Sequence, residues 1–307
     1  MIELTAEEDF ERMDIFLSEK LNITRSQIKK LITQGNIIGD HDAKPAAKVK
    51  AGDRFIITLP ESENLSVIEP QPVSFEVVYE DNYLIVINKP AGLVVHPAPG
   101  NPDRTLVNGL VYRYPELAKL TSKLRPGIVH RLDMGTSGLM VVARNTQTAL
   151  KLHDMFQQRQ ISKKYIALAH GRPAKDHGVI SGPIERDPDN YLKMAIVQNG
   201  RPSLTGYKVL WTRNNFSLVR LKLFTGRTHQ IRVHFAALGC PLVGDVTYGA
   251  PEEEAQELGR VLLHSWRLAF THPVTGKKME FRQYIPEAFI SFIEKIKDVE
   301  RNEPEGL

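Results

Sequence analysis

Several side chains able to bind anions or move protons lie together near the middle of the chain. They occupy a polar hinge between two short apolar runs, residues 128–129 and 139–143, and are His130, Arg131, Asp133, Thr136 and Ser137. Short apolar runs bounded by glycine are typical of buried strands, and paired glycines permit a tight turn or the close approach of a ligand. A carboxylate beside a cation, on a loop braced by rigid strands, is where enzymes usually place their chemistry. An Arg–Asp pair that merely pins the hinge fits the composition equally well.

The order of the residues in this hinge favours the chemical interpretation. His130-Arg-Leu-Asp133, followed by Thr136-Ser-Gly138, resembles the signature of the RluA-type pseudouridine synthases, whose aspartate is catalytic. The resemblance implies that Asp133 is the catalytic carboxylate of an RNA pseudouridine synthase that needs no cofactor. It also implies that His130 and Arg131 bind the substrate. Enzymes that act on a base flip it out of its stack, and the planar guanidinium of Arg131 would fill the vacated place.

Two later segments extend the resemblance. Thr225-Gly-Arg-Thr-His-Gln-Ile-Arg232 matches a family pattern whose first arginine, Arg227, would pair with the catalytic aspartate. Lys163-Lys-Tyr165 matches a pattern whose tyrosine packs on the target base, although tyrosine is also common in ordinary strands. Beyond these segments, the resemblance implies that Leu262 or Leu263 forms an apolar wall beside the base, with Leu263 favoured.

The histidines of the second segment also raise the question of a metal site. His229 and His234 are five residues apart, so they would not share one face of a helix. No acidic or cysteine ligand follows at a spacing that would complete a metal site. We therefore expect no metal.

The elements around these residues can be read from their periodicity. Residues 161–170 alternate as a half-buried strand does, and residues 145–159 have helical spacing. A strand ending at Gly226 is followed by a helix that Thr228 can cap and Gly239 stops. Arg227 thus occupies a strand-to-helix corner. Earlier in the chain, residues 80–82 separate two strand-like runs and predict a hairpin, and residues 89–97 match an early family motif to which we assign a structural role.

The N-terminal segment contains Arg12-x-Asp14, Thr24-Arg-Ser-Gln-Ile-Lys-Lys-Leu-Ile32 and Val49-Lys-Ala-Gly-Asp53. In these motifs it resembles an S4 RNA-binding domain, which packs two helices on a small sheet. We expect helices at residues 10–21 and from Thr24, where Thr24 and Gln27 form a capping box and Gly35 ends the helix. Helix N-termini favour phosphate, and basic residues continue along this helix. The expected RNA-binding residues are Arg12, Arg25, Ser26, Lys29 and Lys30. A solvated helix face is the alternative interpretation of the same charges.

These observations predict an α+β chain with two folded parts. Residues 1–60 form the S4-like domain, 61–74 a polar linker, 75–298 the catalytic domain and 299–307 a tail. The resemblance implies that the catalytic domain carries a mixed, mainly antiparallel sheet.

The bulk composition sets limits on partners and location. The chain has 307 residues, 42% of them hydrophobic, and a formal charge of +4, which permits a nucleic-acid partner without requiring one. A single cysteine, Cys240, rules out an internal disulfide and fits the cytoplasm. The acidic N-terminus does not resemble a signal peptide, and no apolar run is long enough to span a bilayer. We expect a cytoplasmic monomer that binds RNA, with ribosomal large-subunit RNA or a ribosomal particle favoured over transfer RNA, and no membrane.

Some alternatives stay open at this level. Asp133 could attack the sugar covalently or remove a sugar proton to give a glycal intermediate. A non-enzymatic RNA-binding or ribosome-assembly protein would have little reason to keep Asp133, Tyr165 and Arg227 together. A two-carboxylate glycosidase would need a second acid, and the matched motifs supply no convincing partner for Asp133. The sequence does not identify the modified uridine, because RNA recognition depends largely on shape and single-stranded loops.

Overall fold

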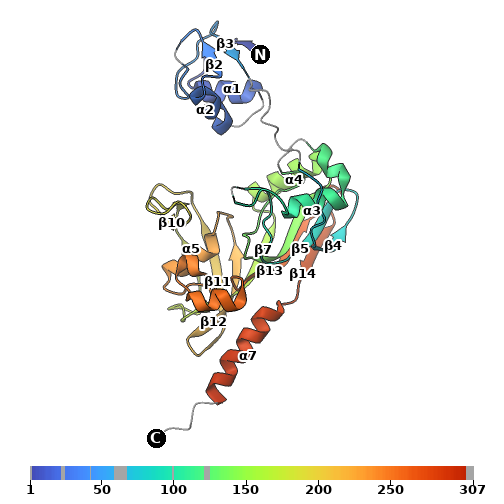
Figure 1. Ribbon diagram of the computed structural model, residues 1–307, viewed down its shortest axis with the longest axis vertical. Coiled ribbons are helices and arrows are strands. Elements are labelled where there is room, and N and C mark those ends of the chain that lie inside the picture. The colour runs from blue at the N-terminus through green and yellow to red at the C-terminus, as the bar shows by residue number, and fades with distance from the viewer. Residues whose placement is uncertain are drawn as a thin grey trace. The chain divides into compact units, whose positions relative to one another are not determined.

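The chain folds into two compact units, residues 1–66 and 67–307 (Figure 1). The computed structural model describes residues 2–21, 25–41, 43–58, 68–98, 100–120 and 125–301, without the side chains of residues 26, 27, 30 and 298–301. Within these residues, no helix is both long and apolar enough to cross a membrane.

The small unit packs two helices on a three-stranded antiparallel sheet, which is the layout expected of an S4-like domain. The strand order is β1-β3-β2. Its core is formed by buried apolar side chains that include Phe16, Leu17, Ile28 and Phe55. The elements are β1 (Ile2–Thr5), α1 (Met13–Leu21), α2 (Arg25–Thr33), β2 (Ile37–Gly39) and β3 (Arg54–Ile57).

The end of α2 follows from its glycine, as the sequence predicted. Gly35 has φ +72°, its amide donates to the carbonyl of Ile32, and the amide of Asn36 donates to Leu31. This pair of hydrogen bonds is a Schellman cap, which satisfies carbonyls that the helix end would otherwise leave free. The predicted cap residue at the other end, Thr24, lies outside the described residues.

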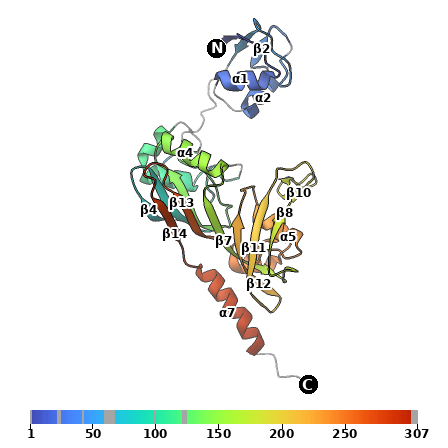
Figure 2. The same ribbon diagram turned by 180° about the vertical axis from the view of Figure 1, so that it is seen from behind.

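The large unit is built on a nine-stranded sheet in its described part, seen from opposite sides in Figures 1 and 2. The strand order is β4-β5-β6-β13-β7-β12-β11-β8, and β14 also pairs with β13. The β6–β13 pair is parallel and the other pairs are antiparallel, so the predicted mixed, mainly antiparallel sheet is confirmed. The strands are β4 (Glu76–Glu80), β5 (Leu84–Lys89), β6 (Ser137–Ala143), β7 (Ser162–His170), β8 (His177–Ser181), β11 (Leu204–Arg213), β12 (Phe216–Leu223), β13 (Leu263–Thr271) and β14 (Lys278–Arg282).

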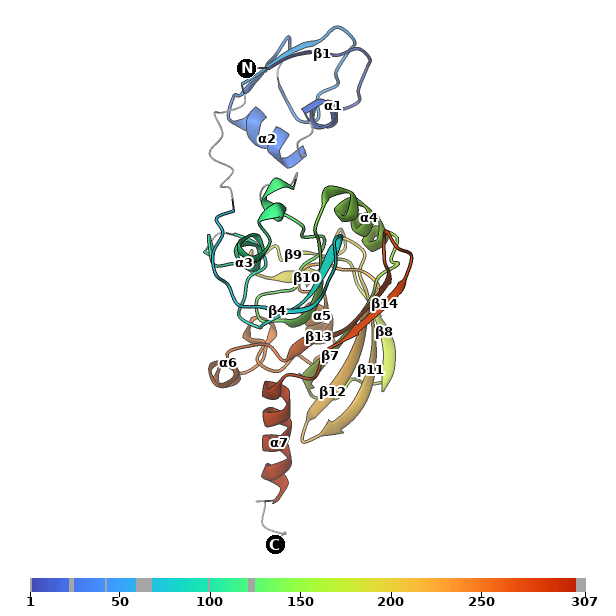
Figure 3. The same ribbon diagram turned by 90° about the vertical axis from the view of Figure 1, so that its right-hand side faces the viewer.

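Helices cover both halves of this sheet. α4 packs against β6 and α5 against β11. α7, labelled in Figure 3, contributes Phe289, Phe292 and Ile296 to a separate apolar cluster that includes Leu168. A second, two-stranded sheet pairs β9 (Ile184–Arg186) with β10 (Met194–Ile196). The helices are α3 (Leu106–Arg113), α4 (Thr146–Gln157), α5 (Gln230–Ala237), α6 (Glu252–Leu258) and α7 (Glu287–Arg301), with 3₁₀ turns η1 (Pro115–Lys119) and η2 (Val246–Tyr248).

The parallel pairing of β6 with β13 depends on Gly138. Its φ is +116°, and a Cβ at this position would lie 2.4 Å from the carbonyl oxygen of Ser265 on β13. Glycine is therefore required for the two strands to approach. This contact fixes the turn that precedes β6, where Asp133 lies.

Two predicted boundaries need correction. Part of the expected linker, residues 68–74, belongs to the large unit: Ile68 is buried in its core, and Asn108 of α3 bonds the carbonyl of Glu69. The closing helix runs to Arg301, so residues 299–301, which were predicted as part of the tail, belong to this helix. Of the two apolar runs around the hinge, residues 139–143 form most of β6. Ile128 makes only an isolated bridge to Val142.

Candidate active site

A cavity of about 620 Å³ opens on one side of the large sheet, where the turn before β6, α4, β7 and the end of β12 meet. Its wall combines one carboxylate with several cations and rings. They include Arg131, Asp133, Tyr165, Arg201, Phe224 and Arg227. Three segments that are far apart in the sequence thus bring Asp133, Tyr165 and Arg227 to one cavity.

Asp133 lies at the start of a turn that leads into β6. Its carbonyl accepts a hydrogen bond from the amide of Thr136, and its side chain is 19% exposed. Nη1 of Arg232 lies 3.5 Å from Oδ2 of Asp133, at the long end of an ion pair. The carboxylate is therefore held near a cation and remains open to the cavity.

A second carboxylate fixes the orientation of Arg232. Nε and Nη2 of Arg232 donate to the two oxygens of Asp245 at 2.7 and 2.8 Å, which is the bidentate geometry that guanidinium and carboxylate favour. Asp245 is 1% exposed and Arg232 8%. Burial alone would lower the pKa of Arg232, but Asp245, and then Asp133, outweigh burial and raise it. Arg232 consequently stays charged and presents Nη1 to Asp133.

The expected pairing of Arg227 with Asp133 is wrong. Within the described residues, Nε of Arg227 donates to the carbonyl of Pro202, and Arg232 is the arginine that contacts Asp133. α5 starts at Gln230, after His229 in a left-handed conformation (φ +55°), one residue later than a cap at Thr228 predicts. Arg227 lies in the loop before the helix and lines the cavity, whereas Arg232, in the first turn of the helix, is buried beside Asp133.

A signal for Arg232 was present in the sequence. It is the last arginine of the Thr225–Arg232 segment and is followed by Val233 and Phe235, so it lies on a helix with a largely apolar surface. A buried guanidinium needs a carboxylate partner. Asp245 follows thirteen residues later, outside any spacing that a single helix would explain.

Tyr165 lies on β7 with its ring in the cavity wall. It is 4% exposed, and its backbone pairs with Leu221 of β12. Burial raises the pKa of Tyr165; the nearby charge of Asp133 acts in the same direction, and a hydrogen bond with Ser265 opposes it. The phenol is therefore uncharged at neutral pH and offers a flat, neutral face beside Asp133.

His130 and Arg131, which were predicted to bind the substrate, have different surroundings. Nε2 of His130 accepts the amide of Val141, and its ring lies 4.7 Å from that of Phe156. Burial, with a smaller effect of Lys163, lowers the pKa of His130 to about 3, so the imidazole is neutral and braces the hinge. Arg131 is exposed and lines both the main cavity and an adjoining one of about 350 Å³.

Leu263 does not form the predicted apolar wall. It is 3% exposed at the start of β13 and belongs to the same buried cluster as Tyr165. Leu223 and Phe224, at the end of β12, line the cavity in its place. β13 lies between β6 and β7 in the sheet. Its first residues therefore lie between the strand that follows Asp133 and the strand that carries Tyr165.

Lys89 supports the Asp133 turn, although no role was predicted for its side chain. It is completely buried, and its Nζ donates to the carbonyls of Pro90, Leu93 and Met134 at 2.8, 2.8 and 3.2 Å. Burial lowers the pKa of Lys89 to about 7, while the charge of Asp133 opposes that shift. The amide of Gly92 also donates to Met134. The loop at residues 89–92 therefore holds the residue that follows Asp133, which agrees with its predicted structural role.

His229 and His234, which were considered above as metal ligands, both have hydrogen-bond partners within the protein. Nδ1 of His229 lies 2.9 Å from the hydroxyl of Tyr248, and the ring of His234 lies between Ser203 and Thr205. The described residues contain no group of three or more His, Cys, Asp or Glu side chains arranged to hold a metal.

Cations gather along the rim of the main cavity. Arg159, Arg201 and Arg227 all line it, and burial together with the charges of Arg201 and Arg159 lowers the pKa of Arg227. Burial also lowers the pKa of Lys163 to about 8. Like charges this close repel one another, and a bound anion would relieve the repulsion.

In the small unit, two of the predicted RNA-binding arginines share one buried carboxylate. Arg12 and Arg25 both bond Asp14, which is 0% exposed, and the hydrogen bond from Arg12, aided by Arg25, lowers the pKa of Asp14 to about 2. About half of the Arg25 side chain, 52%, is still exposed. Lys29 is exposed on α2, while the side chains of Ser26 and Lys30 lie outside the described part of the chain.

Comparisons with known proteins agree on one family. A family model described as RNA pseudouridylate synthase matches residues 83–237. Ribosomal large subunit pseudouridine synthase D of Neisseria meningitidis serogroup A is 43% identical over 289 residues, covering 90% of this chain and 76% of that protein. An uncharacterised RNA pseudouridine synthase of Bacillus subtilis, YlyB, is 39% identical over 300 residues, covering 96% and 98% of the two chains.

A solved structure has a similar fold. Human RNA pseudouridylate synthase domain containing 1 superposes with a TM-score of 0.58 at 28% sequence identity, covering 77% of this chain and 98% of that one.

Proposed function

Because the chain belongs to the RNA pseudouridine synthase family, we propose that it isomerises uridines of large-subunit ribosomal RNA, with Asp133 as the catalytic carboxylate. The observation that carries this proposal is the placement of Asp133: a partly exposed carboxylate in a large cavity, beside a guanidinium whose other edge is bound to Asp245. The ribosomal substrate is supported by the similarity to ribosomal large subunit pseudouridine synthase D of Neisseria meningitidis.

The reaction rearranges a nucleoside without adding or removing atoms. The N1–C1′ bond of uridine breaks, the uracil turns, and a C5–C1′ bond forms, while the proton lost from C5 is balanced by one gained at N1. Asp133 would begin this either by attacking C1′ or by removing the C2′ proton to give a glycal. Both routes need a carboxylate held in place at the sugar, and Nη1 of Arg232 lies 3.5 Å from Oδ2 of Asp133.

The detached uracil must be kept flat and away from water. Tyr165 supplies an uncharged ring in the same wall as Asp133, where the base can stack during its turn. A site that excludes water prevents capture of the sugar by hydrolysis. Arg131, exposed at the junction of the two cavities, would fill the gap that the flipped uridine leaves in the RNA.

The rim arginines would hold the RNA backbone. Arg201 and Arg227 lie at the mouth of the cavity, and guanidinium forks match the geometry of phosphate oxygens. In this proposal Arg227 binds phosphate. The ion pair expected for it from the sequence is made by Arg232.

Substitution of Asp133 tests the catalytic assignment. In the Asp133→Asn variant we expect no release of tritium from RNA carrying C5-tritiated uridine, with RNA affinity close to wild type, because the amide keeps the shape and loses the charge. The matched control is Asp103→Asn, an exposed carboxylate on the surface, which should retain full activity. Tritium release by Asp133→Asn at a rate near that of wild type would refute the assignment.

Mapping pseudouridines tests the substrate. RNA from cells that lack this protein should miss one or more pseudouridines in the large-subunit ribosomal RNA, and the wild-type gene should restore them. Loss confined to transfer RNA would replace the proposed substrate while leaving the catalytic assignment intact.

A further inference from the structure

Four cationic side chains form a row across four neighbouring strands of the large sheet. Lys222 of β12 pairs directly with Lys164 of β7, Lys164 pairs with Arg267 of β13, and Arg267 pairs with Arg282 of β14. Directly paired residues point to the same face of a sheet. These four residues, called the basic row below, therefore lie side by side on one face.

The basic row is an unfavourable arrangement in the absence of a partner. Like charges directly opposite each other destabilise paired strands, and the row contains three such pairs in succession. Glu280 bonds both Arg267 and Arg282, so one carboxylate is shared by two of the four cations. Lys208 and Arg220, which also pair with each other, add a further like-charged pair in the same part of the sheet.

The face that carries the row is opposite to the catalytic cavity. Neighbouring residues on a strand point to opposite faces, so Lys164 points away from the side on which Tyr165 lines the cavity. The row also begins close to the cavity. Lys222 lies over the ring of Phe224 at 4.7 Å, and Phe224 lines the cavity wall. A smaller hollow of about 180 Å³ is lined by Lys222 and by the cavity residues Lys163 and Phe224.

We propose that the basic row binds the sugar–phosphate backbone of the RNA after it leaves the cavity over the end of β12. This inference rests on the proposed RNA substrate and extends its path to the far face of the sheet. Strands lie about 4.8 Å apart, so four side chains span roughly 14 Å of this face. That length suits a run of successive phosphates. Contacts to phosphate carry little sequence information, so the row would add affinity and leave the choice of uridine to the cavity.

A charge-neutral variant of the row tests the proposal. Lys164→Gln/Lys222→Gln/Arg282→Gln removes three cations and leaves the Arg267–Glu280 pair in place. The probes are an in vitro transcript of the large-subunit ribosomal RNA and a short stem-loop that spans only the modified uridine. Binding of the long transcript, measured over a range of salt concentrations, should show a log–log slope shallower by about two, since three counterion-releasing contacts are lost. The loss of affinity for the long transcript should exceed that for the stem-loop by about tenfold.

A control variant that loses the same number of positive charges separates the effect of the basic row from the effect of net charge. Lys119→Gln/Lys175→Gln/Lys297→Gln removes three exposed lysines elsewhere on the large unit and should behave as wild type with both RNAs. Equal losses in the two triple variants would overturn the proposal, as would equal losses on the long and short RNAs. Failure of the proposed function would look different: wild type would release no tritium, whatever the binding curves show.

Discussion

At the scale of single residues, the site depends on one guanidinium that serves two carboxylates. Arg232 makes a bidentate pair with Asp245 and reaches Asp133 with its remaining nitrogen. Asp245 is buried more deeply than Asp133, so it acts as the anchor, and Asp133 keeps the exposure that a reacting group needs. In the proposed mechanism, Asp245 thus sets the orientation of Asp133 indirectly, through Arg232.

Removing the guanidinium should have two effects that can be separated. Arg232→Met should lower kcat by at least about a hundredfold, because Asp133 loses its held partner. It should also lower the free energy of unfolding by about 3–5 kcal/mol, since Asp245 is left buried and unpaired.

The double variant Arg232→Met/Asp245→Asn should regain most of the stability, because the unpaired charge is gone, but none of the activity. Urea unfolding and tritium release measure the two quantities. Recovery of activity in the double variant would mean that Arg232 acts only through the fold.

Lys89 provides a second test at this scale. Lys89→Met fills the same space but leaves the carbonyls of Pro90 and Leu93 without their donor, while the carbonyl of Met134 keeps the amide of Gly92. The unfolding free energy should fall by about 2 kcal/mol, because each carbonyl left unsatisfied costs on the order of 1 kcal/mol or more. Well below the melting temperature, kcat should fall far less than in Asp133→Asn, since Gly92 still holds Met134. The exposed Lys119→Met is the control. A loss of kcat as large as that of Asp133→Asn would show that the ammonium takes part in the reaction.

The sequence predicted part of this site and missed the rest for identifiable reasons. Asp133, Arg131 and Tyr165 were placed by contiguous motifs, and they do line one cavity. Arg227 and Leu263 were assigned by position within a motif, which does not reveal where a helix starts or which side of a strand end meets the cavity. Arg232 and Lys89 are positioned by partners 13 and 45 residues away, Asp245 and Met134, and no local pattern reports such contacts.

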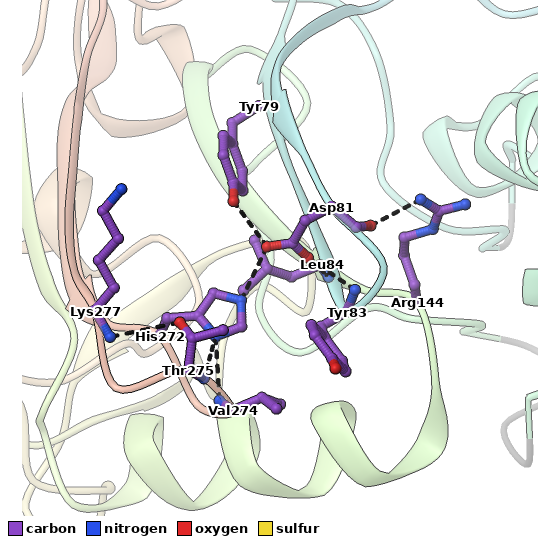
Figure 4. Close-up of polar contacts among 9 residues, drawn as sticks. All are labelled: Tyr79, Asp81, Tyr83, Leu84, Arg144, His272, Val274, Thr275 and Lys277. Carbon is purple, nitrogen blue, oxygen red and sulfur yellow. Dashed lines mark hydrogen bonds and ion pairs between the residues drawn. The ribbon is translucent and has the colours of Figure 1, made fainter.

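At the scale of elements, a polar corner fastens the β4–β5 hairpin to the β13–β14 hairpin (Figure 4). Asp81 accepts hydrogen bonds from the hydroxyl of Tyr79, from Nε2 of His272, and from the amides of Tyr83 and Leu84. His272 is 2% exposed, and its Nδ1 accepts the amides of the turn that follows it. Nε2 must therefore carry the proton that it donates to Asp81.

This corner predicts a pH dependence of stability. Burial raises the pKa of Asp81, but the amides of Leu84 and Tyr83, with Tyr79 and His272, outweigh burial and lower it. A carboxyl whose pKa is lower in the folded state stabilises the protein above its unfolded pKa of about 3.9 and loses that effect as the pH falls through the folded pKa.

Asp81→Asn should therefore be less stable than wild type by about 1–3 kcal/mol at pH 7, and the difference should shrink as the pH approaches 3. Urea unfolding at several pH values measures it, with the exposed Asp103→Asn as control. A difference that stays constant from pH 7 to pH 3 would contradict the assigned charge on Asp81.

The individual helices and strands were largely predictable from the sequence, but the pairing partners of the strands were not. The hairpin at residues 76–89, the helix after Asn145 and the strand at residues 162–170 follow local periodicity and caps, and the structure has all three. The insertion of β13 between β6 and β7 is a pairing over more than a hundred residues, and alternation within a strand does not specify its partner. The basic row could not be predicted from the sequence for the same reason, because its four residues come from four separate strands.

At the scale of the whole molecule, the small unit is expected to add to RNA binding. It is a compact unit with its own apolar core, so its removal should leave the core of the large unit intact. A variant lacking residues 1–66 should bind ribosomal RNA more weakly and with a shallower salt dependence, because basic contacts release counterions.

The catalytic rate of this shortened chain at saturating RNA should stay close to that of the full chain. Binding titrations across salt concentrations, paired with tritium release, separate the two quantities. An unchanged salt slope would show that the S4-like unit has another role.

The position of β13 in the chain also bears on when the proposed site can assemble. β13 is the strand that joins the half of the sheet bearing Asp133 to the half bearing Tyr165, and it is made of residues 263–271. Translation proceeds from the N-terminus, so both of these residues are synthesised well before the strand that unites their halves of the sheet. A nascent chain that has not reached residue 263 therefore contains both side chains without the strand that brings them together.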